Sequence, residues 1–406
     1  MLEAMTQLDL VTQQTALALL RLRGETAGQA LAVQLLRRWD DLDDEQRTTF
    51  FTFLLTDLGP DPTAIDGAIE RYREDSNPQR MLELSEAAES QRQPLFRALN
   101  TAPGGIAALL EMRTALLARR RTHPELGPVE HDLSHLLRSW FNRGFLHLEQ
   151  LDWTTPAHVL EKLIEYEAVH EIRGWDDLRR RLAPDRRSFG FFHPALPGEP
   201  VIFVEVALTN GMARSIQDVI DAPNPDGPPE DADAAIFYSI TNCQTGLRGI
   251  SFGSFLIKQV TERLAGEMPG LTTFATLSPI PGFAGWLEGE DPDADTTDRE
   301  LMERRCAQYL LGARRGQLPL DPVARFHLRN GARVDRINWQ GDISAKGMKE
   351  SHGLLVNYRY SGEDLLGNHD ALVQDGVVIA SPDVLSLAGD TIDTSLVADS
   401  PTRVAP

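Results

Sequence analysis

The spacing of apolar residues changes near residue 145, and this change limits the possible folds more than any other feature. Before it, apolar residues recur every three or four positions, as in Ala30, Val33 and Leu36. That spacing predicts amphipathic helices packed in a bundle. Helix-ending residues, Pro and Gly, interrupt the pattern at 59–62 and 103–105. Residues 1–145 are therefore expected to form an all-helical bundle domain.

The rest of the chain, residues 146–406, alternates strand-like and helical patterns. Strand-like runs rich in Val, Ile and aromatic residues lie at 200–208, 235–240, 271–277, 332–339 and 353–360. Helical patterns lie at 255–264 and 298–311. This alternation predicts a mixed α/β domain after the bundle, so the fold class is α+β. Residues after Ser386 are mostly small and polar and are expected to be loosely held.

Charge and cysteine content exclude several classes of protein. Lys and Arg number 40 against 60 Asp and Glu, which argues against a main partner among nucleic acids. Two cysteines, Cys243 and Cys306, are too few for a disulfide framework and fit a reducing compartment. No apolar run approaches the roughly 20 residues that cross a bilayer, and the first residues do not resemble a secretory signal. We expect a cytoplasmic protein without nucleic-acid or membrane partners.

A glycine-punctuated segment, 246–254, stands between a predicted strand and a predicted helix. Such a turn exposes backbone N–H groups at the positive end of the helix dipole, which suits a pyrophosphate. The spacing matches neither the Walker pattern nor the dinucleotide fingerprint. It resembles the acyl-CoA loop of GNAT-type acetyltransferases, with Arg248, Ser251 and Gly253 in loosely matching places. The alternative is a tight connection that binds no ligand.

Two further segments contain candidate catalytic side chains. Ser278 stands at the end of a predicted strand, and the residues that follow it, Pro-Ile-Pro-Gly, fix the backbone beside its hydroxyl. His327 stands between helix-like and strand-like segments and could give or take a proton near neutral pH. The alternatives are an ordinary turn serine and a structural histidine.

Other signals favour structural interpretations. His131 and His135 have helical spacing but lack the glutamate of the zinc-protease pattern, so a solvated helix face is expected. The arginine runs 119–121 and 179–181 could meet phosphates, but runs of charge on helices are usually solvated. Cys243 has no evident activating partner, so a buried thiol is expected.

Taken together, the motifs of the second half resemble those of malonyl-CoA decarboxylases. The resemblance covers most of this half closely and the helical half more weakly, through 140–141 and 166–170. The motifs, all in one order, are Phe237-Tyr238-Ser239-Ile240, Gly246-Leu247-Arg248-Gly249, Leu277-Ser278-Pro279-Ile280-Pro281-Gly282-Phe283, Phe326-His327-Leu328-Arg329-Asn330-Gly331-Ala332, Arg336-Ile337-Asn338-Trp339 and Asn357-Tyr358-Arg359-Tyr360.

The resemblance implies a helical domain used in oligomer assembly, as a dimer or tetramer, followed by a GNAT-like catalytic domain. It implies malonyl-CoA and acetyl-CoA as ligands, Ser278 and His327 as catalytic residues, and Tyr360 near the acyl group. It also implies an acyl-CoA loop, in which Ser251 replaces an acidic residue of some relatives. The loop residues are Arg248, Gly249, Ile250, Ser251, Phe252, Gly253 and Ser254.

The reaction itself agrees with these residues. Loss of CO2 from malonyl-CoA leaves charge on the thioester enolate, so the thioester is the electron sink and neither a cofactor nor a metal is expected. Ser278 would position the carboxylate and His327 would protonate the enolate carbon. An acyl-CoA-dependent acyltransferase on the same fold and a non-catalytic CoA-binding scaffold remain as alternatives.

Overall fold

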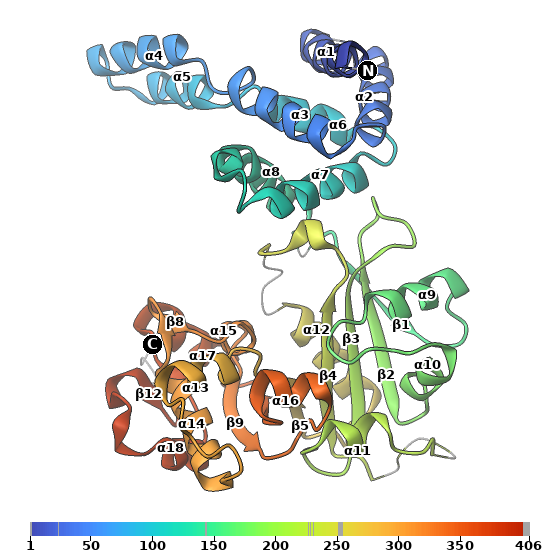
Figure 1. Cartoon of the computed structure of the whole chain (residues 1–406), viewed down its shortest axis with the longest axis vertical. Helices are drawn as coiled ribbons and strands as arrows, with labels where there is room; N and C mark the ends of the chain where they lie inside the picture. The colour runs from blue at the N-terminus through green and yellow to red at the C-terminus, as the bar shows by residue number, and fades with distance from the viewer. Residues whose placement is uncertain are drawn as a thin grey trace. The chain divides into compact units, whose positions relative to one another are not determined.

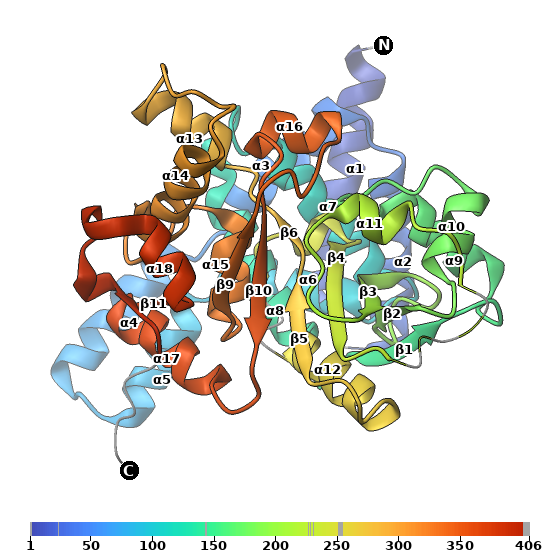
Figure 2. The ribbon, with the colours of Figure 1, turned by 90° about the horizontal axis from the view of Figure 1, so that it is seen from below.

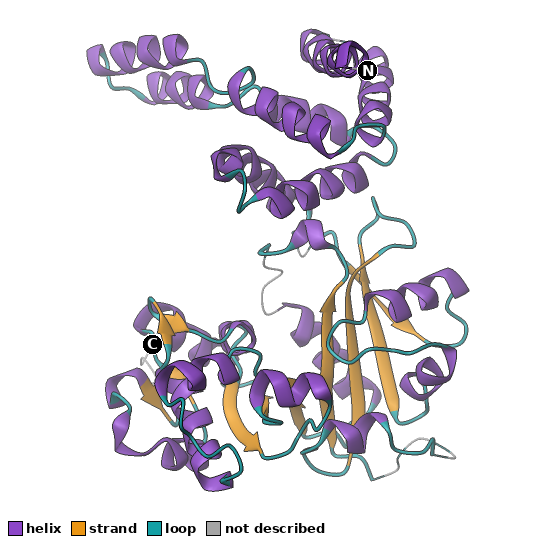
Figure 3. Cartoon of the chain, in the orientation of Figure 1, coloured by secondary structure: helices purple, strands orange, loops and turns teal. Residues whose placement is uncertain are grey.

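The computed structural model describes residues 2–22, 24–142, 144–225, 227, 229, 231–250 and 255–400. The chain divides into two compact units. The first comprises residues 1–146, 193–197 and 244–251, and the second comprises 147–192, 198–243 and 252–406. The described elements of the first unit are helical and those of the second are mixed (Figure 3). This arrangement confirms the predicted α+β fold class.

Helices of the first unit begin and end where the local chemistry favours it. Asp43 caps α3 with a complete capping box, and Pro62 stands in the first turn of α4. Trp39 of α2 packs on Phe51 of α3 with ring centroids 5.2 Å apart. The helices are α1 (Leu2–Arg21), α2 (Glu25–Asp40), α3 (Asp44–Thr56), α4 (Pro62–Glu74), α5 (Pro78–Ala88), α6 (Arg92–Asn100), α7 (Gly105–Arg119), η1 (Pro124–Leu126) and α8 (Gly127–Trp140), and η2 (Thr245–Leu247) joins them later in the chain (Figure 1).

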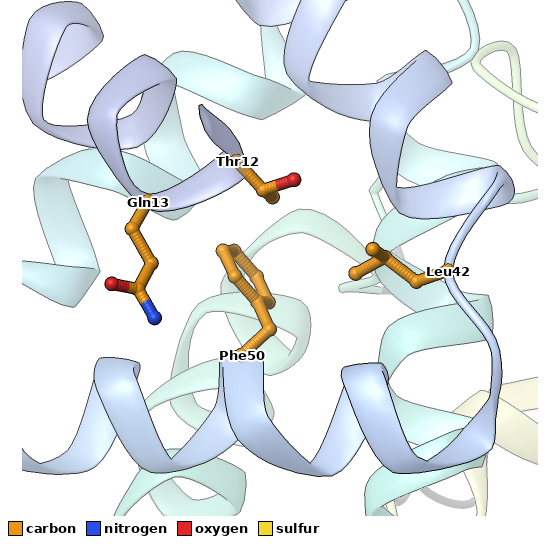
Figure 4. A pocket seen from close by; sticks show the side chains of 4 residues that line it. All are labelled: Thr12, Gln13, Leu42 and Phe50. Atoms are coloured by element: carbon orange, nitrogen blue, oxygen red, sulfur yellow. The ribbon is translucent and has the colours of Figure 1, made fainter. Parts of the chain in front are cut away.

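Packing within the first unit is uneven. Between α1 and α3, Thr12, Gln13, Leu42 and Phe50 line a small hollow that has no room for a ligand (Figure 4). Helices α4 and α5 form a hairpin that packs mainly on itself, and α5 has no fully buried residue. About half of the surface of Met81 and Leu82 on α5 is exposed, at 48% and 51%. The hairpin therefore leaves an apolar face without a partner in its own unit.

The second unit is built on an eight-stranded sheet in the order β1-β2-β3-β4-β5-β10-β6, with β9 also pairing with β10 (Figure 2). Neighbouring strands are antiparallel except β4 and β5, which pair in parallel from Ala234↔Thr273 to Phe237↔Thr276. The strands are β1 (His147–Leu151), β2 (Arg186–Phe192), β3 (Pro200–Thr209), β4 (Ala234–Asn242), β5 (Thr273–Thr276), β6 (Ser278–Pro279), β9 (Arg333–Asn338) and β10 (Leu355–Tyr360).

Helices and short strands complete this unit. Near its C-terminal end, β12 pairs in parallel with β11, so the expectation of a loosely held tail was wrong for this segment. The elements are α9 (Ala157–Tyr166), α10 (Trp175–Arg181), α11 (Ile216–Ile220), α12 (Phe255–Glu267), α13 (Phe283–Glu290), α14 (Arg299–Gly312), β7 (Arg314–Arg315), β8 (Leu318–Pro319), α15 (Pro322–Arg329), α16 (Ala345–Ser351), α17 (Leu365–Asp375), β11 (Val378–Ile379), α18 (Pro382–Ala388), η3 (Gly389–Thr391), η4 (Thr394–Leu396) and β12 (Val397–Ala398).

Apolar side chains of the sheet form the core of the second unit. Ile236, Ala275 and Leu355 pack together with residues of α11, and Phe203 packs with residues of α9 and α10. Burial of such side chains supplies the main stabilising free energy of the sheet. Among the described helices, none combines the length and the apolar character that crossing a membrane requires.

Candidate active site

Ser278 and His327, two separate candidates from the sequence, lie side by side in the second unit. Ser278 begins β6, and His327 lies in the last turn of the short helix α15. Both residues are buried, with 5% and 4% of their surface exposed. Ser278 Oγ lies 3.1 Å from His327 Nε2, within hydrogen-bond distance. The fold thus unites two residues that are 49 positions apart in the sequence.

Tyr360 of β10, the third predicted residue of this site, contacts the opposite side of the imidazole. Its hydroxyl oxygen lies 2.7 Å from His327 Nδ1. Tyr358 of the same strand stacks its ring on His327 with centroids 4.7 Å apart. Phe237 of β4 lies beside Tyr360, with centroids 6.5 Å apart. Burial lowers the pKa of His327 to about 3, so the imidazole is neutral at pH 7.

The directions of the hydrogen bonds define the tautomer of His327. The Ser278 hydroxyl donates to Thr276 Oγ1 at 2.8 Å. A serine hydroxyl has a single hydrogen, so the ring must donate its Nε2–H to Ser278 Oγ. His327 Nδ1 then accepts from the Tyr360 hydroxyl. The four side chains form one directed chain of hydrogen bonds, from Tyr360 through His327 and Ser278 to Thr276.

Thr276 was not among the candidates from the sequence. It lies at the end of β5, is fully buried, and also accepts the backbone N–H of Tyr358 at 3.1 Å. Residues two apart on an extended chain point to the same side, and Thr276 precedes Ser278 by two. That spacing was the available signal, but a threonine in a strand is too common to single out by itself.

The structure describes the first part of the predicted acyl-CoA loop. Arg248 and Gly249 are exposed, Ile250 is buried, and Gly249 has a φ of 78°, which favours glycine. These three residues belong to the first compact unit. The remaining predicted loop residues, Ser251, Phe252, Gly253 and Ser254, lie outside the described residues. Helix α12 begins at Phe255, as the strand–loop–helix pattern predicted.

A buried arginine of the helical unit holds the start of this loop. Arg113 of α7 donates from its guanidinium to the carbonyl oxygens of Gly246 and Arg248, and it pairs with Glu130 at 2.7 Å. A Cβ atom on Gly246 would lie 2.3 Å from the carbonyl oxygen of Leu110, so only glycine fits there. The sequence did not reveal Arg113, because a single arginine in a helix has no local signature of such a contact.

The remaining sequence signals have structural explanations. His131 and His135 are exposed on α8, as expected of a solvated helix face. Within the described part of the chain, no group of three His, Cys, Asp or Glu side chains could hold a metal ion. Burial raises the pKa of the Cys243 and Cys306 thiols, which makes both unreactive near pH 7.

The expectation that the arginine runs are solvated was wrong for three of their members. Arg119 is buried and pairs with Asp44, and Arg180 pairs with Asp185 at 2.8 Å. Arg181 pairs with Glu205 at 3.1 Å in the core of the second unit. All three side chains are buried and form ion pairs, Arg119 with an exposed carboxylate and Arg180 and Arg181 with largely buried ones, whereas Arg120, Arg121 and Arg179 are exposed.

Two family models match this chain. The malonyl-CoA decarboxylase N-terminal domain matches residues 58–141, and the malonyl-CoA decarboxylase C-terminal domain matches residues 144–299 and 289–397. The chain belongs to the malonyl-CoA decarboxylase family. This confirms the family resemblance inferred from the sequence motifs.

Individual members of the family agree in sequence and in fold. The mitochondrial malonyl-CoA decarboxylase of the goose Anser anser anser is 37% identical over 72% of this chain and 68% of its own length, and that of the mouse is 36% identical over 72% and 70%. The crystal structure of malonyl-CoA decarboxylase from Rhodopseudomonas palustris is 47% identical with a TM-score of 0.87, and that from Agrobacterium vitis is 47% identical with 0.88. Each alignment covers 93% of this chain and 99% of the other.

Proposed function

We propose that this family member is a carboxy-lyase that converts malonyl-CoA into acetyl-CoA and CO2. The observation that carries the proposal is the buried chain of hydrogen bonds from Tyr360 through His327 to Ser278, in a protein of the malonyl-CoA decarboxylase family. A serine hydroxyl and a neutral imidazole side by side, shielded from water, suit a reaction that must stabilise and then protonate an enolate.

In this reaction the bond between the α-carbon and the carboxylate breaks, and its electron pair moves into the thioester enolate. A proton then forms a new bond to the α-carbon. The thioester carbonyl accepts the electrons by itself, so the protein has to orient the carboxylate, stabilise the enolate and deliver one proton. The first and the last of these tasks can be assigned to residues of the site.

When the substrate binds, the Ser278 hydroxyl turns its hydrogen from Thr276 to the malonyl carboxylate and so positions it, and His327 donates its Nε2 proton to the enolate carbon. A neutral imidazole is acid enough for this step, because the α-carbon of a thioester is a far weaker acid. As Nε2 loses its proton, Nδ1 can take the proton of the Tyr360 hydroxyl, so the ring stays neutral. Solvent later restores the proton of Tyr360.

The loop from Arg248 to Ser254 is proposed to bind the phosphates of coenzyme A. It precedes α12, whose N-terminus favours negative charge. Arg248 adds an exposed guanidinium, which can bind phosphate through two hydrogen bonds. Arg113 would hold this loop in place through the carbonyl oxygens of Gly246 and Arg248.

We also propose that the protein assembles as a dimer or tetramer through its helical domain, residues 1–145, and that it works in the cytoplasm. The unpartnered apolar face of the α4–α5 hairpin, with Met81 and Leu82, supports self-association. The two free thiols, Cys243 and Cys306, agree with a reducing compartment. Light scattering on a sizing column measures the assembly, and a Met81→Glu, Leu82→Glu double variant should reduce its mass.

The decisive experiment is incubation of the purified full chain with malonyl-CoA after treatment with a chelator, with acetyl-CoA followed by chromatography. We expect rapid formation of acetyl-CoA that the chelator does not diminish. If malonyl-CoA raises the melting temperature but is not converted, the protein binds acyl-CoA without decarboxylating it. Transfer of an acetyl group to an added amine acceptor would instead identify an acyltransferase.

A further inference from the structure

The carboxylate of Asp321 lies between the segment that carries Ser278 and the helix that carries His327. Asp321 is only 1% exposed and precedes the first residue of α15. Its Oδ1 atom accepts the backbone N–H groups of Val323 and Ala324, each at 2.9 Å. This side of the carboxylate caps α15, the helix that carries His327 in its last turn.

The other oxygen of the same carboxylate faces the Ser278 segment. Asp321 Oδ2 accepts the backbone N–H of Gly282 at 3.3 Å, and it lies 3.4 Å from the hydroxyl of Tyr309, which can donate to it. Gly282 ends the rigid Pro-Ile-Pro-Gly stretch that follows Ser278 and directly precedes α13. One side chain therefore joins the starts of two helices: α13, which follows the Ser278 segment, and α15, which carries His327.

The side chains around Gly282 and Asp321 are closely packed. A Cβ atom on Gly282 would lie 2.1 Å from the hydroxyl of Tyr309, so a side chain cannot fit at this position. Among the described residues, no Lys or Arg pairs with Asp321. Burial raises the pKa of this carboxyl group, while the three backbone N–H donors and the Tyr309 hydroxyl act against that rise. Burying a carboxyl group without a cation costs free energy, which its hydrogen bonds have to offset.

We propose that Asp321 is a positioning residue for the decarboxylation, which holds Ser278 and His327 in register through the backbone. This inference rests on the proposed function of the site. Asp321 acts through geometry and not through charge on the imidazole, because burial alone accounts for the low pKa of His327. Its loss should therefore slow turnover without changing how the rate depends on pH.

Asp321→Asn separates the two halves of the link. The asparagine oxygen can still cap α15, but the amide nitrogen that replaces Oδ2 cannot accept the N–H of Gly282. We expect kcat to fall at least tenfold, with KM for malonyl-CoA within about threefold of its original value, since small displacements of reacting groups are costly in rate. The pH at which kcat is half-maximal should not move.

A matched control is available at another helix of the same unit. Asp298 caps α14 by accepting the backbone N–H of Leu301 at 3.2 Å, and it is exposed. Asp298→Asn changes the same chemical group at a helix start away from Ser278 and His327, so kcat should stay within twofold. A second pair of variants tests the packing: Gly282→Ala should lower kcat, and adding Tyr309→Phe should restore part of it by removing the clashing oxygen.

Hydrogen exchange provides a measure that needs no activity. In Asp321→Asn the amide of Gly282 should exchange faster than in the original protein, while those of Val323 and Ala324 keep their protection. If the original protein does not decarboxylate malonyl-CoA, the proposed function fails and the exchange data still test the link. If the original protein is active and Asp321→Asn keeps kcat within threefold, or if the pH profile shifts, the positioning role is wrong.

Discussion

At the scale of single residues, the site is marked by a histidine that has no charged partner among the residues that the structure describes. His327 contacts hydroxyl groups and aromatic rings, and burial keeps its ring neutral. A neutral imidazole has one N–H hydrogen, and the directions of the hydrogen bonds place this hydrogen on Nε2, which faces Ser278. The imidazole is thus prepared to donate toward the space beside Ser278 before any substrate arrives.

His327→Ala should lower kcat by about 10²- to 10⁴-fold, the usual contribution of a positioned general acid. The affinity for acetyl-CoA, measured by calorimetry, should remain within threefold, because the proposed CoA contacts lie elsewhere. His131→Ala, on the exposed face of α8, is the control and should leave both quantities unchanged. If kcat and the affinity for acetyl-CoA fell by the same factor, His327 would be a binding residue and its role as a general acid would be wrong.

Tyr360→Phe removes the hydroxyl group that bonds to His327 Nδ1 and leaves the aromatic ring in place. We expect kcat to fall roughly tenfold to a hundredfold, in line with about 1.5–3 kcal/mol for a hydrogen bond that involves a charged group, here the Tyr360 oxygen after it has given up its proton. The control is Tyr166→Phe. Tyr166 lies on α9, and its hydroxyl contacts Glu199 at 3.2 Å. Full activity of Tyr360→Phe would rule out the proposed transfer of a proton to Nδ1.

The sequence analysis named Ser278, His327 and Tyr360 as candidates, and the structure brings them together, but it named neither Thr276 nor Asp321. The first three stand in distinctive motifs, with rigid or aromatic neighbours. Thr276 and Asp321 resemble an ordinary strand residue and an ordinary helix cap. Their importance comes from distant segments that meet in space, such as Gly282 with Asp321, and a single sequence does not encode that meeting in any local pattern.

At the scale of elements, the helical unit contributes more than a bundle. Its helix α7 supports the loop at 244–250 through Arg113 and through the close approach of Gly246 to Leu110. No motif of residues 1–145 pointed to this contact with the loop. Periodicity predicts which face of α7 is buried, but it does not show that residues more than 130 positions later pack on that face.

Arg113→Ala should raise the KM for malonyl-CoA about tenfold and change kcat less than threefold, because the proposed CoA loop loses its anchor. The control is Arg92→Ala, which breaks another buried ion pair of the same unit, with Asp132 at 2.6 Å, and does not touch the loop. Both variants should lose stability on the order of 3–5 kcal/mol, so only the KM distinguishes them. An unchanged KM in Arg113→Ala would contradict the anchoring role.

The strands β3, β4, β5, β9 and β10 and the helices α12 and α14 were predicted to within a few residues, whereas β1, β2 and the short elements were not. His327 was expected between a helix-like and a strand-like segment, whereas it lies inside α15. The sequence Asp321-Pro322 is a recognisable helix start, but the helix has only eight residues and its periodicity is too short to detect. Short elements depend on tertiary contacts, which local patterns do not contain.

At the scale of the whole molecule, buried histidines link stability to pH. Burial lowers the pKa of His170 to about 4, with Arg181 and Lys346 acting in the same direction and Asp342 against them. The unfolded chain binds a proton at each histidine near pH 6.5, whereas the folded protein does not until the pH is much lower. Folding is therefore opposed by protonation of His170 and His327 as the pH falls below 6.5.

Between pH 7 and pH 5, the free energy of unfolding of His170→Gln should fall less steeply than that of the original protein. The difference in slope should approach about 1.4 kcal/mol per pH unit. Burial raises the pKa of Glu205 while Arg181 acts against that rise, so this carboxyl group acts in the opposite direction and the comparison of variants is the informative quantity. Urea unfolding at several pH values measures it, with His131→Gln as control, and identical slopes in all three proteins would contradict the prediction.

The α4–α5 hairpin has a consequence for how such a protein can evolve. Because its outer residues bury little against the other helices, they can be exchanged without disturbing the core or the hydrogen-bonded chain around His327. Under the proposed assembly through this hairpin, mutations there change which copies associate, and how many, while the chemistry is preserved. Quaternary structure is therefore expected to diverge faster between lineages than the site that every copy carries.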